Sequence, residues 1–147
     1  MKMTNQEYSK YVQRMAPPSP FWKDLLLAFL IGGAICTLGQ GILELWKHWG
    51  LEQKDAATAT SITMVFLGAF LTGLGVYDQV AKAGGAGTLV PITGFANSIV
   101  SPALEFKSEG FITGMAAKMF IISGPVLVFG ISASVVYGLI LVLFGLA

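Results

Sequence analysis

The chain has 147 residues, of which 54% are hydrophobic and only 12% are charged, and its formal net charge is +1. A soluble domain carries about 25% charged residues, so this composition favours an integral membrane protein. The few basic residues are scattered, which excludes the clustered surface that nucleic-acid backbones require. The single cysteine and the single histidine exclude an internal disulfide and offer no metal-ligand cluster, so we expect no metal and no other cofactor.

Residues 1–23 form a polar lead-in to the first apolar stretch. Within it, residues 5–15 predict a short amphipathic helix with Tyr8, Tyr11, Val12 and Met15 at helical spacing. Three prolines then end this helix and give a stiff linker. Four basic residues precede the first span, against Glu7 as the one acid before Asp24, and this bias places the N-terminus in the cytoplasm. The basic residues are Lys2, Lys10, Arg14 and Lys23.

Four stretches of the remaining chain carry no charge: 25–43, 56–77, 83–104 and 119–147. A crossing helix needs about 20 apolar residues at a rise of about 1.5 Å each, and the first, second and fourth stretches qualify. The full spans are expected at about 24–46, 56–77 and 120–144. A short helix through Lys118 is expected before the last span. Residues 24–147 then form a single membrane domain of the all-α class.

Small residues recur at every fourth position on the first and last spans. Such faces let helices approach closely in lipid, because no bulky side chain holds the backbones apart. A packing face is therefore favoured over a pore lining at these positions. The expected helix-packing residues are Gly32, Gly33, Gly41, Gly130, Ser134 and Gly138.

The stretch 83–104 is long enough to span a membrane but is a poor continuous helix. Each interior proline removes a backbone hydrogen bond at a cost of about 3 kcal/mol, and clustered glycines add backbone entropy. Irregular backbone at membrane depth is tolerated only where protein buries it or where it lines a wet cavity. The sequence therefore predicts a broken segment, either re-entrant or a fourth crossing, of the kind where transporters and channels place their sites. The side on which the C-terminus lies depends on that choice.

The candidate pore or substrate-binding residues lie in and around this broken segment. Successive small residues free backbone N–H groups to form an anion-binding nest, and Thr93 is a candidate N-cap for a short helix. Asp78 and Glu105 could bind a cation or pair with Lys82 and Lys107, although ordinary interfacial charges are the commoner case. A lysine at a helix centre costs about 2.5–3.5 kcal/mol, so Lys118 either reaches the membrane surface or faces an anion pathway. The full set is Asp78, Gly84, Gly85, Gly87, Pro91, Thr93, Gly94, Asn97, Glu105 and Lys118.

Enzymatic activity is not expected, and no catalytic residue is assigned. The one histidine, His48, lies between Trp46 and Trp49 at a membrane interface rather than beside a nucleophile. The acids at the membrane edges show no paired spacing, and the glycines at 84–87 lack the lysine and threonine of a phosphate-binding loop.

Three runs of this chain resemble the SpoVAC/SpoVAEb family over essentially its whole length. They are GLGVYD at 73–78, AGGAGTLVPITGFANSIVSPALEFKSEG at 83–110, and GPV at 124–126. The resemblance implies a multi-pass protein of the inner membrane of the forespore and spore. It also implies a role in moving dipicolinic acid with calcium during sporulation and germination, in a family that includes a channel-like member responsive to membrane tension. The implied partners are a SpoVAEb-like paralogous membrane subunit and a SpoVAD-like soluble subunit.

Two functions remain open at this point. Three or four crossings are too few to enclose a pore for dipicolinate, so a channel would be a homo- or hetero-oligomer in which the small-residue faces meet. Alternatively, the chain is a non-conducting structural subunit that docks soluble partners through the helix at 5–15 and the polar turn at 107–110. The costly broken and polar elements within the membrane favour the channel subunit.

Overall fold

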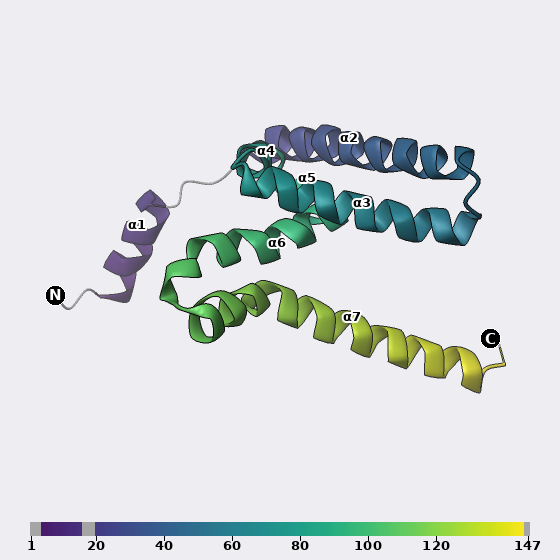
Figure 1. Ribbon diagram of the computed structural model, residues 1–147. Helices are drawn as coiled ribbons and strands as arrows, with labels where there is room; N and C mark the ends of the chain where they lie inside the picture. The colour runs from purple at the N-terminus through teal and green to yellow at the C-terminus, as the bar shows by residue number, and fades with distance from the viewer. Residues whose placement is uncertain (1–3, 16–19, 146–147) are drawn as a thin grey trace.

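The computed structural model describes residues 4–15 and 20–145, and within these ranges the chain is helical and contains no strand (Figure 1). The all-α prediction is confirmed. In chain order the elements are α1 (Asn5–Met15), α2 (Phe21–His48), α3 (Gln53–Gly73), α4 (Tyr77–Gly84), α5 (Ala86–Leu89), α6 (Ile92–Glu105), the 3₁₀ turn η1 (Lys107–Glu109), the π-helical turn η2 (Phe111–Ala116) and α7 (Ala117–Leu143). The proline linker at 17–20 lies mostly outside the described residues.

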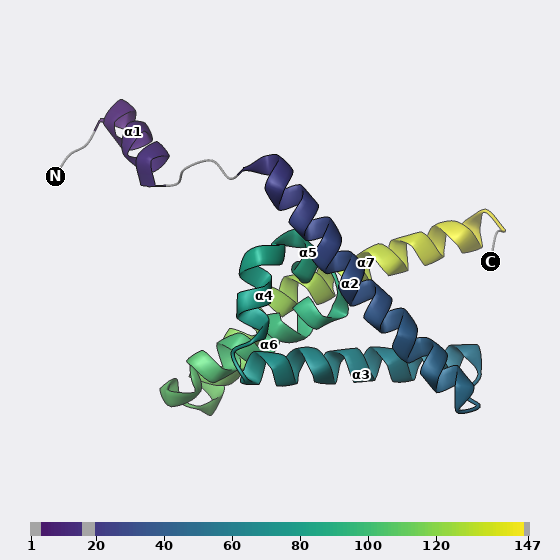
Figure 2. The same ribbon diagram turned by 90° about the horizontal axis from the view of Figure 1, so that it is seen from above.

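Among the described residues, three helices are long and apolar enough to cross a membrane, as predicted: Phe21–His48, Gln53–Gly73 and Phe111–Leu143. Helices α2 and α3 form a hairpin, and α7 starts near the end of the domain where α3 stops and diverges from both helices (Figures 1 and 2). Most of their large apolar side chains are exposed on the isolated chain. Exposure of this kind is what lipid contact requires, since the bilayer interior is itself apolar.

The second span ends at Gly73, four residues earlier than the sequence predicted. Gly75 adopts φ +71°, a left-handed conformation that glycine takes without steric cost. The Gly75 N–H donates to the Thr72 carbonyl at 2.9 Å, and the Val76 N–H donates to the Leu71 carbonyl at 3.0 Å. This pair of bonds is the Schellman motif, which closes a helix and redirects the chain. A glycine such as Gly75 commonly follows the end of a helix, and the predicted end of this span did not take it into account.

The last span also begins earlier than predicted. No break occurs at Lys118, because the π-helical turn η2 continues directly into α7 and the two form one helix over Phe111–Leu143. The positive φ of Gly110, +98°, marks its start. Lys118 therefore lies in the second turn of the long helix that begins at Phe111, rather than at the end of a separate helix.

The segment from α4 to α6, here called the re-entrant segment, begins and ends at the same end of the helical domain (Figure 1). Helices α2 and α3 are close at their connecting loop and splay apart at the other end, and α4 and α5 fill the space between the splayed ends (Figure 2). Helix α6 then returns along α3 and delivers the chain to the start of α7 (Figure 1). None of α4, α5 and α6 is among the described helices long enough to cross a membrane, which favours the re-entrant form over a fourth crossing. The described end of α7 lies at the opposite end of the domain from the start of α2 (Figure 1).

The small-residue faces fall into two groups. Gly32 lies against the re-entrant segment, where an added β-carbon would be 3.0 Å from the Gly87 carbonyl oxygen. The other glycines have nothing within 4 Å of an added β-carbon, and Ser134 is exposed with its hydroxyl donating to the Gly130 carbonyl at 2.9 Å. These open glycines are Gly33, Gly41, Gly130 and Gly138. Of these expected packing glycines, Gly32 is the one that meets another element in the part of the chain described.

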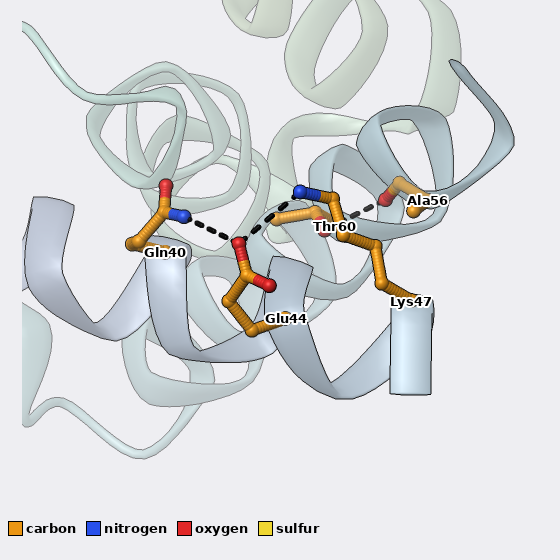
Figure 3. A network of polar contacts seen from close by, with 5 residues as sticks. All are labelled: Gln40, Glu44, Lys47, Ala56 and Thr60. Atoms are coloured by element: carbon orange, nitrogen blue, oxygen red, sulfur yellow. Dashed lines mark hydrogen bonds and ion pairs between the residues drawn. The ribbon is translucent and has the colours of Figure 1, made fainter. Parts of the chain in front are cut away.

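Polar side chains at the loop end of the α2–α3 hairpin bond to one another (Figure 3). The Gln40 amide donates to Glu44 Oε1 at 2.8 Å, and Lys47 Nζ approaches the same oxygen at 3.1 Å. On α3 the Thr60 hydroxyl donates to the Ala56 carbonyl at 2.7 Å (Figure 3). This network gives the Glu44 carboxylate two donors at the far end of the span, where an unpaired charge would be costly.

Candidate functional site

The break between α4 and α5 occurs at Gly85, whose backbone has φ +47° and ψ −121°. Side-chain-bearing residues rarely adopt this conformation because the β-carbon collides with the backbone. The Gly85 N–H donates to the Ala81 carbonyl at 2.8 Å, and the Gly85 carbonyl accepts from the Thr88 hydroxyl at 2.9 Å. The predicted anion-binding nest is therefore wrong at this position, since its N–H is already bonded within the chain.

The other glycines of the segment allow backbones to touch. An added β-carbon at Gly94 would be 2.7 Å from the Leu89 carbonyl oxygen, and at Gly84 it would be 2.7 Å from the Thr88 methyl carbon. On α3, Gly68 meets Thr93 in the same way, at 2.9 Å from its α-carbon. These glycines act as close-packing positions that seat α5 and α6 against their neighbours.

Tyr77 joins the three pieces of the re-entrant segment. Its hydroxyl donates to the Thr88 carbonyl on α5 at 2.8 Å and lies 2.8 Å from Thr93 Oγ1 on α6. All three residues are buried. A phenol carries one proton and can also accept, so Thr93 donates to Tyr77 while Tyr77 donates to the carbonyl. Thr93 is thereby a bridging residue and not the predicted N-cap, which in α6 is Pro91 without a side-chain cap bond.

A second polar contact fixes α6 to α3. Thr72 Oγ1 lies 2.7 Å from the Gly68 carbonyl oxygen and 2.9 Å from Asn97 Oδ1. Thr72 is buried and Asn97 is half-buried. Because this contact anchors one side of the Asn97 amide, the side chain has a defined place at the edge of a neighbouring groove.

The re-entrant segment and the start of α7 form a partly open groove of about 440 Å³, here called the polar groove. It lies among α4, α5, α6 and the start of α7. Its lining residues are Tyr77, Ala81, Gly85, Thr88, Leu89, Gly94, Asn97, Ser98, Ser101, Pro102, Glu105 and Ile122. Apolar groups make up most of its surface, and phenol, hydroxyl and amide groups line the rest, together with a single carboxylate; no lysine or arginine is among the lining residues. Pro102 has no N–H to donate to the Ser98 carbonyl one turn earlier, so a further acceptor is left at the same turn of α6.

The structure brings together four of the ten predicted site residues, Gly85, Gly94, Asn97 and Glu105, in the polar groove. Gly84 and Thr93 are buried behind it, and Gly87 and Pro91 line a hollow on the α2 side of the segment. Asp78 is exposed on α4 and does not line the groove.

The charge pairs that the sequence offered as one possibility do not form. Among the residues that the structure describes, the ion pair within 4.0 Å is Lys47–Glu44, so neither Asp78–Lys82 nor Glu105–Lys107 is paired. Lys118 is half-buried with its Nζ 4.3 Å from the centroid of the Phe106 ring, a cation–π contact. In the part of the chain described, no group of three or more histidine, cysteine, aspartate or glutamate side chains could hold a metal ion.

The sequence reasoning missed Ser98 and Ser101 as groove residues and did not include Thr88. Asn97, Ser98 and Ser101 share one face of α6 with Gly94 and Glu105, following the i, i+3/i+4, i+7, i+11 spacing of a helix. That pattern was available once residues 92–105 were read as one helix. The interior prolines of 83–104 were expected to interrupt the helix there, but Pro102 lies inside α6.

The comparisons with known proteins agree with the resemblance. The family model described as SpoVAC/SpoVAEB sporulation membrane protein matches residues 24–140. The chain is similar to stage V sporulation protein AC of Bacillus subtilis (strain 168), with 43% identity over 141 residues that cover 94% of each chain. No solved structure matches. The extent of the family match and the identity over nearly the full length leave one assignment: the chain belongs to the SpoVAC/SpoVAEB family of sporulation membrane proteins.

Proposed function

We propose that this chain is a channel subunit that passes dipicolinic acid, together with calcium, across the inner spore membrane during sporulation and germination. The observation that carries the proposal is the polar groove held inside a re-entrant segment. Membrane proteins keep non-helical backbone at depth where it is buried or lines a water-filled cavity. Family membership supports a sporulation role, and the groove supports passage of a polar solute.

The lining chemistry favours a solute that is polar but carries no net charge. Dipicolinate is a planar dianion, and its one-to-one complex with Ca²⁺ is neutral. A groove with no cationic side chain would not stabilise a free dianion, whereas hydroxyl, amide and carboxylate oxygens can replace part of the water around a neutral chelate. Within this proposal Asn97 and Ser101 contact the solute, and Glu105 contributes to calcium at the mouth.

One copy does not close a conduit, because the polar groove is open on one side. We therefore place the chain in an oligomer with further copies or with a SpoVAEb-like paralogous membrane subunit, and with a SpoVAD-like soluble subunit at the surface. The open glycines on α2 and α7 would be the helix contacts. The N-terminus faces the cytoplasm in this arrangement. Tension would act by widening the splayed ends of α2 and α3, between which the re-entrant segment lies (Figure 2).

Release of dipicolinate from liposomes tests this proposal. The purified protein is reconstituted alone and with its paralogous subunit, with and without an osmotic downshift. The native thiol is removed by Cys36→Ser, and Ser101→Cys then places one thiol in the groove. Gln53→Cys is the matched control, because Gln53 is exposed at the loop end of α3, away from the groove. We expect a charged, water-soluble thiol reagent to block release through Ser101→Cys and to leave release through Gln53→Cys unaffected.

Two outcomes would overturn the proposal. If the thiol reagent blocks release equally through both cysteine variants, the groove is not the conduction path. No release under any condition, with insertion and assembly verified, would favour the second candidate, a structural subunit that docks soluble partners. That candidate has its own support in α1, which lies apart from the membrane helices (Figures 1 and 2) and exposes Tyr8, Tyr11, Val12 and Met15. It predicts that Tyr8→Ala with Tyr11→Ala abolishes assembly with the soluble subunit.

A further inference from the structure

A second hollow lies on the other face of the re-entrant segment, between α2 and helices α4 and α5. Its volume is about 430 Å³, and it shares only Gly85 with the polar groove. Phe21, Leu25, Ala28 and Ala86 give it an apolar lining, and two charged residues complete it. No part of the proposed conduction route uses this space, so it needs its own explanation.

The two charged residues come from different helices. Asp24 lies in the first turn of α2, and Lys82 lies in the last turn of α4. Both line the same hollow, yet the ion pair within 4.0 Å among the described residues is the one between Lys47 and Glu44. The hollow therefore presents one positive and one negative group that are not joined, at the end where the chain enters the membrane. Such a pair is complementary to a zwitterion.

The apolar part of the hollow continues along α2 towards the middle of the membrane. A neighbouring hollow of about 390 Å³ shares Ala28 and Ala86 with the first and extends past Gly87 and Val90 to Cys36. From Asp24 to Cys36 the helix rises about 18 Å, close to the roughly 15 Å depth of one leaflet of the hydrocarbon core. The whole space, here called the α2 groove, thus runs from a charged end to an apolar end over the depth of a single leaflet.

We propose that the α2 groove binds one phospholipid with an ethanolamine headgroup. The phosphate lies at Lys82, the ammonium group lies at Asp24, and one acyl chain follows α2 past Ala86 and Val90 as far as Cys36. An anionic lipid would meet Lys82 equally well but would leave the Asp24 carboxylate facing negative charge. Pockets between membrane helices that carry a basic residue near the surface are known to hold lipid headgroups. This inference does not depend on whether the chain conducts.

Native mass spectrometry of the full-length protein in detergent tests the inference, with phosphatidylethanolamine and phosphatidylglycerol as the two probes. We expect phosphatidylethanolamine to be retained preferentially. Lys82→Gln should weaken retention of both lipids by about fivefold, the effect of one lysine near a lipid surface. Asp24→Asn should remove the preference by improving retention of phosphatidylglycerol.

Matched controls carry the same charge changes outside the groove. Lys107→Gln and Asp78→Asn alter exposed residues on η1 and α4 that do not line it, and should leave both lipids unaffected. Ala86→Leu gives an independent test, because it fills the apolar part and keeps both charges; it should lower retention of phosphatidylethanolamine. Equal retention of the two lipids by the native chain, a preference for phosphatidylglycerol, or equal effects in groove and control variants would each overturn the inference.

Discussion

The α-carbon of Gly87 lies against the backbone of Ala28, so closely that a β-carbon at position 87 would be 2.8 Å from the Ala28 carbonyl carbon. This contact seats α5 on α2 and holds the re-entrant segment between the splayed ends of the α2–α3 hairpin. Since the obstructing atoms belong to backbone, they cannot move aside as a flexible side chain would. The placement of the segment thus depends on one hydrogen atom in place of a methyl group.

Gly87→Ala should therefore lower the stability of the membrane domain by about 1–3 kcal/mol, the usual cost of overpacking. Thermal unfolding of the purified protein in detergent measures the effect. Gly33→Ala is the control, because a β-carbon at Gly33 meets nothing within 4 Å. A similar loss in both variants would mean that helix propensity, and not the α2–α5 contact, sets the cost.

Gly85 should accept no other residue. Its conformation lies outside the left-handed helical region that asparagine tolerates. We expect Gly85→Ala and Gly85→Asn both to lower stability, by roughly 1–2 kcal/mol or more. Gly50→Asn should be milder, since Gly50 closes α2 in a Schellman motif, with its N–H donating to Lys47 and that of Leu51 to Trp46. Comparable losses at the two positions, measured by thermal unfolding, would contradict this reading.

Loss of the Tyr77 hydroxyl should loosen the re-entrant segment without unfolding the spans. Tyr77→Phe leaves the Thr88 carbonyl without this donor at a buried position, which costs about 1–3 kcal/mol. Hydrogen exchange of the α5 and α6 amides should become faster, while exchange in α2 stays unchanged. Tyr137→Phe is the control, because Tyr137 is exposed on α7. Unchanged exchange in α5 and α6 would show that the hydroxyl does not hold the segment.

Lys118 should affect stability slightly and conduction not at all. Its ammonium group lies over the Phe106 ring and does not line the polar groove. In a double-mutant cycle, Lys118→Gln and Phe106→Leu should show a coupling of about 0.5–1 kcal/mol. Dipicolinate release by Lys118→Gln liposomes should match that of the native chain. A marked loss of release would return Lys118 to the pathway, as the sequence first suggested.

Helix α1 should lose stability in acid. The Thr4 backbone N–H donates to the Glu7 carboxylate at 2.9 Å and the Thr4 hydroxyl does so at 2.9 Å, and these bonds hold the pKa of Glu7 below its ordinary value. A carboxyl whose pKa is lower in the folded state stabilises it fully above the unfolded pKa, and the contribution disappears as the pH falls through the folded value. The protection of the α1 amides, corrected for the intrinsic exchange rate at each pH, should therefore fall on acidification. In Glu7→Gln this protection should no longer depend on pH in the same way.

The packing of Gly85 and Gly94 limits which substitutions can test whether the re-entrant segment lines a pore. Substitution of Gly85 or Gly94 by valine is a poor test of pore lining, because Gly85 has a positive φ and Gly94 touches the α5 backbone. Loss of flux in either variant would report on folding as much as on the pathway. Ser101 is the better position, because it lines the polar groove from the regular helix α6 and needs no special backbone conformation.

The sequence by itself determined the class of the protein and its three spans. Hydrophobic length and the placement of charge are properties of each segment alone, and a helix in lipid satisfies its backbone without help from neighbours. The family could also be read directly, because its motifs are runs of adjacent residues. Helix ends were less certain, although Gly75 carried a local signal for the end of α3.

Only the tertiary structure decided that the broken segment turns back and which of its residues face the polar groove. Glycine and proline announce that a helix is interrupted, but not where the next piece packs. That outcome depends on contacts between distant positions: Gly87 with Ala28, Gly68 with Thr93, and Thr72 with Asn97. Such contacts form between surfaces that neither segment encodes alone. The helix that carries a side chain sets its direction, but the packing of the helices decides which residue that side chain meets.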